Sequence, residues 1–293
     1  MPELPEVEAL ALDLKGRLTD RAVTRVDLVA FSALKTFDPP LSALHGTLVE
    51  DVTRHGKFLD VATSGLHLVV HLARAGWIRW RDEVPALPAR PNSKSPLAAR
   101  VLLDEDDEGR TSGLDITEAG TKKSLAIYVV RDPAEVPGIA RLGPDPLDEA
   151  FTIEVLAQIL ADAGRAQIKG VLRHQGTIAG IGNAYSDELL HAARMSPFKP
   201  ASALSDAELQ TLYDAIRTVL GDAVDRSRGL AASELKGEKK SHLAVHGRTG
   251  ETCPVCGDTV REVSFADSSL QYCPTCQTAG KPLADRRMSR LLK

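Results

Sequence analysis

The 293-residue sequence contains few aromatic residues, few cysteines and no long apolar segment. Aromatic residues make up 4% of the chain, so few rings are available on which exposed nucleobases could stack. The longest apolar stretch, LHLVVHL at 66–72, has the length of a strand and falls short of the roughly 20 residues that a transmembrane helix needs. The N-terminus lacks the basic and apolar regions of a signal peptide, which predicts a cytoplasmic protein without membrane attachment.

The remaining composition is that of a globular protein, with 43% hydrophobic and 26% charged residues. The length allows two domains, each with its own core. The formal net charge of −4 argues, taken alone, against a nucleic-acid partner. The acidic run DEDDE at 104–108 contributes much of that charge and predicts a solvated loop. A local basic groove is compatible with a negative total.

Hydrophobic periodicity divides the chain near residue 130. The first half begins with a predicted helix at 4–18, whose apolar face is formed by Val7, Leu10, Leu14 and Leu18. Strand-like stretches then predict a mostly antiparallel sandwich, at 22–30, 48–65, 66–72, 76–80, 98–105 and 123–130. The proline-rich segment 83–97 predicts an exposed loop.

The second half is predominantly helical. Residues 131–150 are rich in Pro, Gly and Asp, which predicts a linker. Helical patterns follow at 151–164, 168–175, 184–195 and 206–227, with Ser205 as the N-cap of the last. We therefore predict an α+β multidomain protein with a β-sandwich domain, a linker, a helical domain, a cysteine-rich hairpin and a basic tail, at 1–130, 131–150, 151–244, 245–277 and 278–293.

All four cysteines lie in one short segment near the C-terminus. They form two C-x2-C pairs whose spacing is typical of a tetrahedral four-cysteine zinc site. Two disulfides are the alternative, which a cytoplasmic location disfavours. Four protein ligands leave no open position for water, so the pattern predicts a structural Zn²⁺ held by Cys253, Cys256, Cys273 and Cys276.

The glycine-rich stretch GTIAGIGN at 176–183 joins two predicted helices. Gly176, Gly180 and Gly182 permit backbone conformations closed to other residues, and successive amides beside a helix N-terminus suit a phosphate. Asn183 could hold a left-handed turn or donate its amide to that phosphate. A simple glycine-rich connection is the alternative.

The opening residues MPELPE indicate a helix start, because proline suits the first helical position and acidic residues suit the positive end of the helix dipole. This stretch and later ones together resemble the Fpg/Nei family of formamidopyrimidine-DNA glycosylases and endonuclease VIII relatives. The matching pieces occur in order and span almost the whole chain: PELPEVE at 2–8, HGKFLD at 55–60, HL at 71–72, IKGVLRHQGTIAGIGNAYSDE at 168–188, VHGRTGETCPVCG at 245–257 and YCPTCQ at 272–277.

The resemblance implies a catalytic N-terminal helix and β-sandwich, a helical domain with a helix–two-turns–helix motif, and a zinc hairpin, with DNA in the cleft between the two halves. Removal of Met1 would leave Pro2 with a secondary amine, and an α-amino group has a pKa of roughly 8. Attack of this amine on C1′ of a damaged nucleotide would give a Schiff-base adduct and make the enzyme both glycosylase and abasic-site lyase. Glu3 would act as general acid/base, and Glu6 would hold the N-terminus or order water.

The resemblance also assigns the phosphate contacts. Lys57 would contact a phosphate near the lesion and assist elimination, and His71, Lys169 and Asn183 occupy further phosphate-binding positions beside Gly182. Such contacts fix the register of the DNA and carry no sequence information. The lesion must leave the base stack, because C1′ is inaccessible within it.

The sequence departs from the family pattern at three places. Arg74 stands where many relatives have a Met that fills the gap left by the extruded base. The RRF loop is missing, and the nearest segment offers Lys122 and Lys123 as phosphate contacts. Ser268 replaces an Arg at the tip of the zinc hairpin and cannot supply a fixed charge to phosphate. We expect altered lesion choice or weaker action on duplex DNA, with the chemistry retained.

We therefore expect a monomeric bacterial protein, cytoplasmic and associated with the nucleoid, that acts on damaged double- or single-stranded DNA and excises oxidised bases. A non-catalytic or weakly catalytic DNA-damage binder of the same family is the alternative, and an unrelated zinc-ribbon interaction protein is a more remote one. The basic tail would contact DNA or a partner, or pack on the surface.

Overall fold

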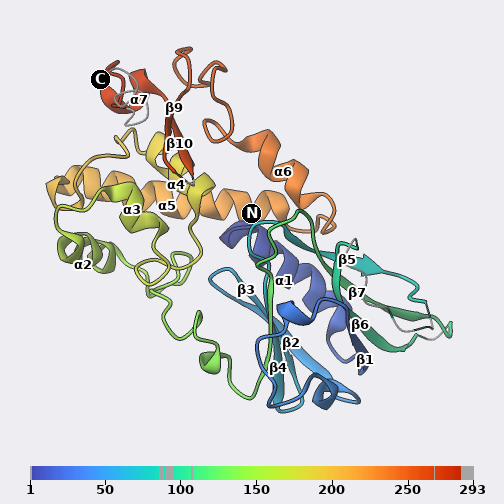
Figure 1. Ribbon diagram of the computed structural model, residues 1–293. Coiled ribbons are helices and arrows are strands. Elements are labelled where there is room, and N and C mark those ends of the chain that lie inside the picture. The colour runs from blue at the N-terminus through green and yellow to red at the C-terminus, as the bar shows by residue number, and fades with distance from the viewer. Residues whose placement is uncertain are drawn as a thin grey trace. The chain divides into compact units, whose positions relative to one another are not determined.

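The computed structural model describes residues 2–284 except 86, 88, 90–94, 107 and 267. Met1, parts of the predicted loop 83–97 and of the acidic run, and the tail from residue 285 lie outside the described residues. The chain forms two compact units (Figure 1). One unit runs to Arg141 and takes in Arg226–Glu238, and the other contains Leu142–Asp225 and continues from Lys239. Among the described residues, no helix combines the length and apolar character that a membrane span requires.

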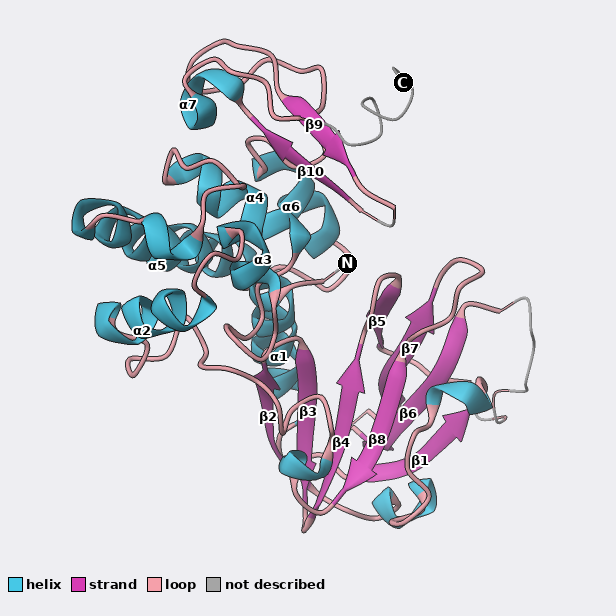
Figure 2. Ribbon diagram, turned by 60° about the vertical axis from the view of Figure 1, so that its left-hand side comes forward, coloured by secondary structure: helices cyan, strands magenta, loops and turns pink. Residues whose placement is uncertain are grey.

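The N-terminal unit is a helix packed with two antiparallel sheets (Figure 2). Its described strands form one sheet in the order β1-β6-β7-β5 and another in the order β2-β3-β4-β8, which confirms the predicted sandwich. The elements are α1 (Leu4–Leu18), β1 (Val23–Leu28), η1 (Phe31–Ala33), η2 (Leu41–Leu44), β2 (Val49–His55), β3 (Phe58–Thr63), β4 (Leu66–His71), β5 (Gly76–Arg81), β6 (Leu97–Glu105), β7 (Thr111–Glu118), β8 (Ala126–Val130) and η3 (Pro133–Glu135).

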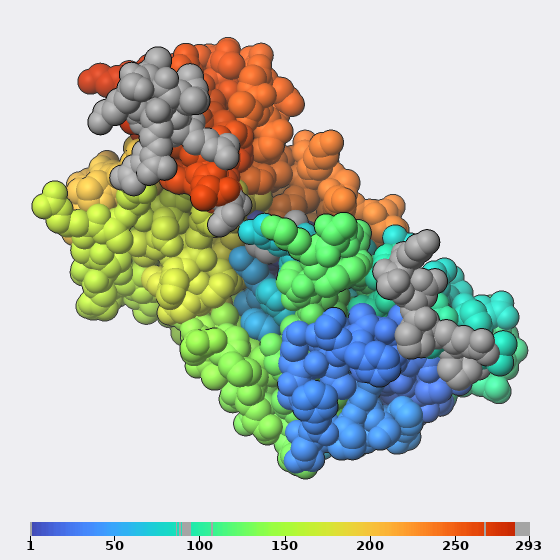
Figure 3. Space-filling view, in the orientation of Figure 1, coloured from blue at the N-terminus to red at the C-terminus, as the bar shows by residue number. Residues whose placement is uncertain are grey.

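Helix α1 supplies part of the core of this unit. Its predicted apolar face is fully buried and joins residues of both sheets in one hydrophobic cluster. On the face shown in Figure 3, the unit presents the lighter blue of the segment around η1 and η2 rather than the deepest blue of α1. Burial of Leu4, Pro5, Glu6 and Val7 holds the start of α1 within the unit.

Strand β7 was not predicted from the sequence, although it lies between β6 and β5 in its sheet. Its sequence TSGLDITE lacks a regular apolar alternation and contains Gly113 and Asp115. The structure explains both residues. A Cβ on Gly113 would lie 2.1 Å from the carbonyl oxygen of Val101 on β6. The buried Asp115 carboxylate accepts hydrogen bonds from Arg100, at 2.6 and 3.0 Å, and from Arg81, at 2.9 Å.

Residues 226–238 also belong to the N-terminal unit, whereas the sequence boundaries placed them in the helical domain. Ala232 and Leu235 are buried in the same hydrophobic cluster as α1. The indole N–H of Trp77 on β5 donates to the Ala232 carbonyl over 2.7 Å.

The C-terminal unit is mainly helical and ends in a β-hairpin, as predicted. Its longest helix, α5, begins where Ser205 and Glu208 cap each other: the Ser205 N–H donates to Glu208 Oε2 over 2.9 Å, and the Glu208 N–H donates to Ser205 Oγ over 3.4 Å. The remaining elements complete the chain: α2 (Ile153–Ala163), α3 (Ile168–Arg173), α4 (Asn183–Ala192), η4 (Ala201–Ala203), α5 (Asp206–Ser227), α6 (Leu235–His242), β9 (Arg261–Ser264), β10 (Ser269–Tyr272) and α7 (Pro274–Thr278).

In the N-terminal unit, the contact at Gly113 predicts that two Gly→Ala variants change the free energy of unfolding in opposite directions. Gly113→Ala should lower the free energy of unfolding by about 1–3 kcal/mol, because the new methyl group must displace the β6 backbone. Gly16→Ala should raise it by about 0.5–1 kcal/mol, because Gly16 lies in α1 with open space around its Cα. Urea unfolding measures both, and equal effects would contradict the explanation of β7.

Candidate functional site

The first turn of α1 is held by its own acidic side chains. Glu3 is the N-cap residue, and its backbone N–H donates to Glu6 Oε2 over 2.8 Å within a capping box. Glu3 is 2% exposed and Glu6 is 1% exposed, and Pro2 is buried beside them. The Glu6 carboxylate therefore fixes the backbone immediately after Pro2.

Lys57 lies at the tip of the β2–β3 hairpin. The strands pair up to His55 and Phe58, and Gly56 takes φ +56°, which glycine adopts without strain. Lys57 is buried in the unit rather than extended into solvent. Phe58 pairs with His71 on β4, and the centroids of the two rings lie 4.6 Å apart. The hairpin thus brings Lys57 and His71 into one neighbourhood.

The imidazole of His71 is uncharged at neutral pH. Burial, and to a lesser extent the nearby Lys57 ammonium, lower its pKa to about 4. A neutral imidazole can still donate a hydrogen bond to phosphate, but it adds no positive charge. The predicted phosphate role of His71 is therefore restricted to hydrogen bonding at pH 7.

The loops that depart from the family pattern carry exposed cations. Arg74 is exposed in a tight turn closed by the Gly76 N–H, which donates to the Leu72 carbonyl over 2.8 Å. A Cβ on Gly76 would meet that carbonyl oxygen at 2.2 Å, so this turn requires glycine. Lys122 and Lys123 are also exposed, and the Lys123 ammonium donates back to the carbonyl of Glu118.

The glycine turn between α3 and α4 differs from its predicted geometry. Gly180 has φ +82°, whereas Gly182 is extended and serves as the N-cap residue of α4. Gln175, which no sequence motif singled out, holds the turn: its side chain accepts from the Gly180 N–H at 3.0 Å and donates to the Ile181 carbonyl at 2.7 Å. The Asn183 amide donates to the Ser269 carbonyl of β10 over 2.8 Å.

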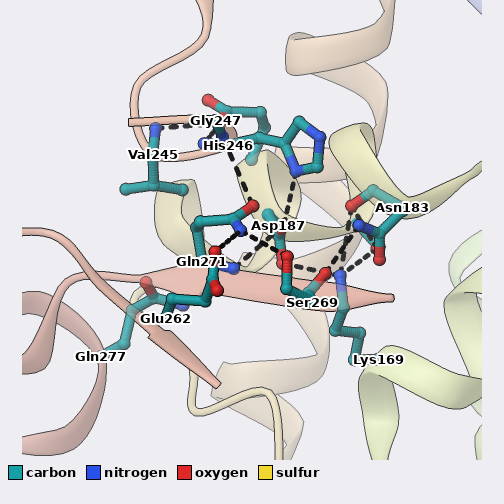
Figure 4. Close-up of polar contacts among 12 residues, drawn as sticks. Lys169, Asn183, Asp187, Val245, His246, Gly247, Glu262, Ser269, Gln271 and Gln277 are labelled. Atoms are coloured by element: carbon teal, nitrogen blue, oxygen red, sulfur yellow. Dashed lines mark hydrogen bonds and ion pairs between the residues drawn. The ribbon is translucent and has the colours of Figure 1, made fainter. Parts of the chain in front are cut away.

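Lys169 is buried, whereas the family resemblance predicts that it contacts a DNA phosphate. It is 5% exposed, and its ammonium donates to Asp187 Oδ1 at 2.6 Å, Ser186 Oγ at 2.7 Å and the Asn183 carbonyl at 3.1 Å. Its charge is therefore matched by a buried carboxylate inside the unit (Figure 4). This arrangement argues against the predicted direct contact between Lys169 and a DNA phosphate.

Two neighbouring carboxylates of α4, Asp187 and Glu188, attach the zinc-binding segment, and Figure 4 shows Asp187 among its partners. Asp187 Oδ2 accepts from His246 Nδ1 at 2.7 Å and from the Gln271 N–H at 3.2 Å. Glu188 accepts backbone N–H groups of 244–246 at 2.6, 3.0 and 2.8 Å. Burial raises the pKa of Glu188, and these N–H donors oppose the shift. No sequence signal indicates these roles, because adjacent acidic residues on a short helix are usually solvated.

The four cysteines meet at the base of the β9–β10 hairpin. Their ligand atoms all lie within 4.8 Å of one another, with Cys256 and Cys273 Sγ 3.3 Å apart and Cys253 and Cys276 Sγ 3.9 Å apart. A tetrahedral zinc with Zn–S bonds of about 2.3 Å spaces its sulfurs by roughly 3.8 Å. The cluster fits a structural Zn²⁺, as predicted. His191 Nε2 of α4 lies 3.3 Å from Cys253 Sγ, a contact that the sequence did not reveal.

Replacing Lys169 distinguishes a buried ion pair from a phosphate contact. Lys169→Met should lower the free energy of unfolding by about 3–5 kcal/mol, because it removes the ammonium that pairs with the buried Asp187 Oδ1. Adding Asp187→Asn should recover part of that loss. The salt dependence of binding to abasic-site duplex DNA should keep its slope, measured by fluorescence anisotropy. A slope reduced by about one with unchanged stability would establish a phosphate contact instead.

The pKa of His71 predicts how stability depends on pH. The unfolded chain binds a proton at His71 below about pH 6.5, whereas the folded chain does so only near pH 4, so stability should fall as the pH drops through this window. The full effect is up to about 3 kcal/mol in unfolding free energy. His71→Gln should flatten the profile from urea unfolding relative to that of the wild type. An NMR titration of His71 near 6.5 would contradict this assignment.

Three family models match the chain in the order of its structural parts. The formamidopyrimidine-DNA glycosylase N-terminal domain matches residues 1–121, the formamidopyrimidine-DNA glycosylase H2TH domain matches 142–234, and the zinc finger found in FPG and IleRS matches 250–279. The H2TH match begins where the C-terminal unit begins, and the zinc-finger match contains all four cysteines.

Two relatives with the name formamidopyrimidine-DNA glycosylase cover nearly the whole chain, and a third protein covers about half of it. The formamidopyrimidine-DNA glycosylase of Symbiobacterium thermophilum is 35% identical over 300 residues, covering 98% of this chain and 93% of that protein. The enzyme of that name from Thermus thermophilus is 34% identical, covering 96% and 100%. An uncharacterized formamidopyrimidine-DNA glycosylase-like protein of Mycobacterium tuberculosis is 61% identical over 160 residues, covering 55% of this chain and 99% of that protein.

Solved structures agree with these relatives. The crystal structure of MutM (Fpg) from Thermus thermophilus has a TM-score of 0.77 at 32% identity, covering 96% of this chain and 100% of that one. Lactococcus lactis Fpg, bound non-covalently to DNA containing an AP site, has a TM-score of 0.78 at 25% identity, covering 94% and 99%. With its sandwich, its helix–two-turns–helix motif and its four-cysteine hairpin all matched in order, the chain belongs to the formamidopyrimidine-DNA glycosylase family of DNA repair enzymes.

Proposed function

We propose that this protein is a bifunctional DNA glycosylase and abasic-site lyase that excises oxidised bases through a Schiff base on Pro2. The observation that carries the proposal is the first turn of α1, where Pro2 directly precedes a buried Glu3 whose backbone is fixed by Glu6. Covalent catalysis of this kind uses a nucleophile with an acid–base group close to it, and Glu3 is the residue next to Pro2. Membership of the glycosylase family supports it independently.

The proposed reaction begins with the secondary amine that removal of Met1 leaves on Pro2. Its nitrogen bonds to C1′ of the damaged nucleotide while the C1′–base bond breaks, and the proton lost from the amine nitrogen neutralises the departing base. Glu3 donates a proton to the sugar ring oxygen as the ring opens, and the nitrogen becomes part of an iminium ion. Because a secondary amine has no second proton to lose from that nitrogen, the positive charge persists and can act as an electron sink.

The iminium ion then drives strand cleavage. The Glu3 carboxylate left by ring opening takes a C2′ proton as the 3′ phosphate leaves. Loss of the C4′ proton to a base then expels the 5′ phosphate, and water hydrolyses the remaining iminium bond, which releases the sugar remnant and regenerates the amine. Lys57 would contact a phosphate near the lesion during these steps. His71, uncharged at neutral pH, would donate a hydrogen bond to phosphate rather than supply a charge.

DNA contacts outside the reacting nucleotide would come from exposed cations and from the glycine turn. Arg74 and Lys122 are exposed and available to phosphates or to the gap in the stack, with the Lys123 charge nearby. The Gly182 N-cap and the Asn183 amide would face phosphate. The Asn183 amide binds Ser269 in the free protein, so this phosphate contact would replace an internal hydrogen bond. A solved relative bound to DNA that contains an AP site supports damaged DNA as the ligand.

Borohydride trapping tests the proposed chemistry. The protein with Met1 removed should form a covalent complex with abasic DNA, stable to denaturing gel electrophoresis, because reduction fixes the iminium bond. Pro2→Gly should change the product pattern, since a primary amine forms a neutral imine. Binding of abasic DNA without trapping on any lesion would instead support the non-catalytic damage binder, which the departures at Arg74 and Ser268 allow.

Glu3→Gln separates the acid step from nucleophilic attack. Base excision should fall by about 10²–10⁴-fold, because the amide cannot donate the proton that opens the sugar ring. Single-turnover excision from a duplex carrying an oxidised base measures the rate. Lys15→Gln, an exposed change on the same helix, is the matched control. Excision at the wild-type rate in Glu3→Gln would remove Glu3 from the mechanism.

A further inference from the structure

Arg54 is a buried cation next to the hairpin that carries Lys57. Its side chain is 6% exposed, and Nε donates to Glu8 Oε2 on α1 over 2.7 Å. Its Nη1 donates to the carbonyl of Gly56, the residue before Lys57, over 3.2 Å. One guanidinium therefore bonds both to the helix that begins at the proposed nucleophile and to the turn that presents Lys57.

The opposite side of the hairpin has its own anchor. Successive residues of a strand point to opposite faces, so Arg54 and His55 hold the hairpin from two sides. His55 Nε2 lies 3.1 Å from Asp60 Oδ2, and His67 Nδ1 lies 3.0 Å from Asp60 Oδ1 on the same buried carboxylate. The contact between His55 and Asp60 thus fixes the turn at 56–57 to the sheet, and the contact between Arg54 and Glu8 fixes it to α1.

We propose that Arg54 is a positioning residue for the reaction: by bonding Glu8 and the Gly56 carbonyl at once, it holds Lys57 in a fixed place relative to α1. This inference rests on the proposed function, because α1 begins at Pro2 and Glu3. Catalytic groups must be held to within a fraction of an ångström, and a displacement of about 1 Å can cost about 100-fold in rate. A planar guanidinium with two directed N–H bonds supplies that restraint, which a flexible lysine would not.

The same two elements offer a matched control. Lys15 Nζ of α1 pairs with Asp51 Oδ1 of β2 at 2.8 Å. Their side chains are 52% and 40% exposed, and neither is bonded to the hairpin tip in the contacts described for them. Breaking this pair removes an ion pair between α1 and β2 without touching the turn at Gly56.

The kinetic test compares Arg54→Gln, Arg54→Lys, Glu8→Gln and the double variant Glu8→Gln/Arg54→Gln with Lys15→Gln. The single-turnover rate of strand cleavage at an abasic site should fall at least 10-fold in Arg54→Gln, while the Kd for duplex DNA carrying a tetrahydrofuran analogue stays within twofold. The double variant should be no slower than Arg54→Gln, because both changes break one connection. Wild-type cleavage in Arg54→Gln, or equal losses in Lys15→Gln, would overturn the proposal.

A second readout needs no enzymatic activity. Burial and, to a lesser extent, the Lys57 ammonium lower the pKa of His71 to about 4, so release of the hairpin should raise this pKa in Arg54→Gln and leave it unchanged in Lys15→Gln. NMR titration of each folded variant measures this directly. If the wild type cleaves no DNA but the His71 pKa rises in Arg54→Gln, the proposed function fails and the restraint stands. An unchanged His71 pKa overturns the restraint whatever the activity.

Discussion

A carboxylate removed from water must be surrounded by hydrogen-bond donors, because its desolvation costs several kcal/mol. This constraint organises both units of the chain. In the N-terminal unit, buried Glu6 accepts the N–H of Glu3 and fixes the start of α1. In the C-terminal unit, Asp187 and Glu188 accept hydrogen bonds from Lys169, from the segment before the zinc site and from β10. The start of α1 and the zinc-binding segment are thus each held in place by buried acids.

The same constraint determines which cations remain available for DNA. The charge of Lys169 is matched by Asp187, and the charge of Arg54 is matched by Glu8. His71 is uncharged at neutral pH because burial and Lys57 both disfavour its protonated form. Under the proposed function, the electrostatic attraction for phosphate would come from other cations, of which Arg74 and Lys122 are exposed. The sequence departs from its family at these positions, so we expect an altered lesion preference.

The parts of the fold that sequence predicted are those with a regular local signal. The apolar face of α1, the Ser205 cap of α5 and the paired cysteines are read from spacing alone, and each is found in the structure. Strand β7 was missed because its Gly113 and Asp115 are explained by neighbours in the sheet rather than by periodicity. The N-terminal packing of 226–238 depends on contacts across about 150 residues of sequence, such as Trp77 with Ala232.

In the candidate site, too, residues within a recognisable motif were predicted and residues that depend on tertiary contacts were not. The family resemblance proposed roles for Glu3, Lys57, Lys169 and Asn183, but a matching lysine in a motif does not tell a buried ion pair from an exposed phosphate contact, since both require a cation. No role was predicted for Asp187, Glu188 or Arg54, because each forms hydrogen bonds with partners that a local motif does not include.

The proposed chemistry requires that the amine of Pro2, held beside Glu3, bonds to deoxyribose. Peptide mapping of the borohydride-trapped complex by tandem mass spectrometry tests this requirement at the level of the atom. We predict that the sugar remnant is attached to the nitrogen of residue 2 in a peptide that begins with proline. A remnant on the side chain of Lys57 or another lysine, or a trapped peptide that still begins with Met1, would contradict it.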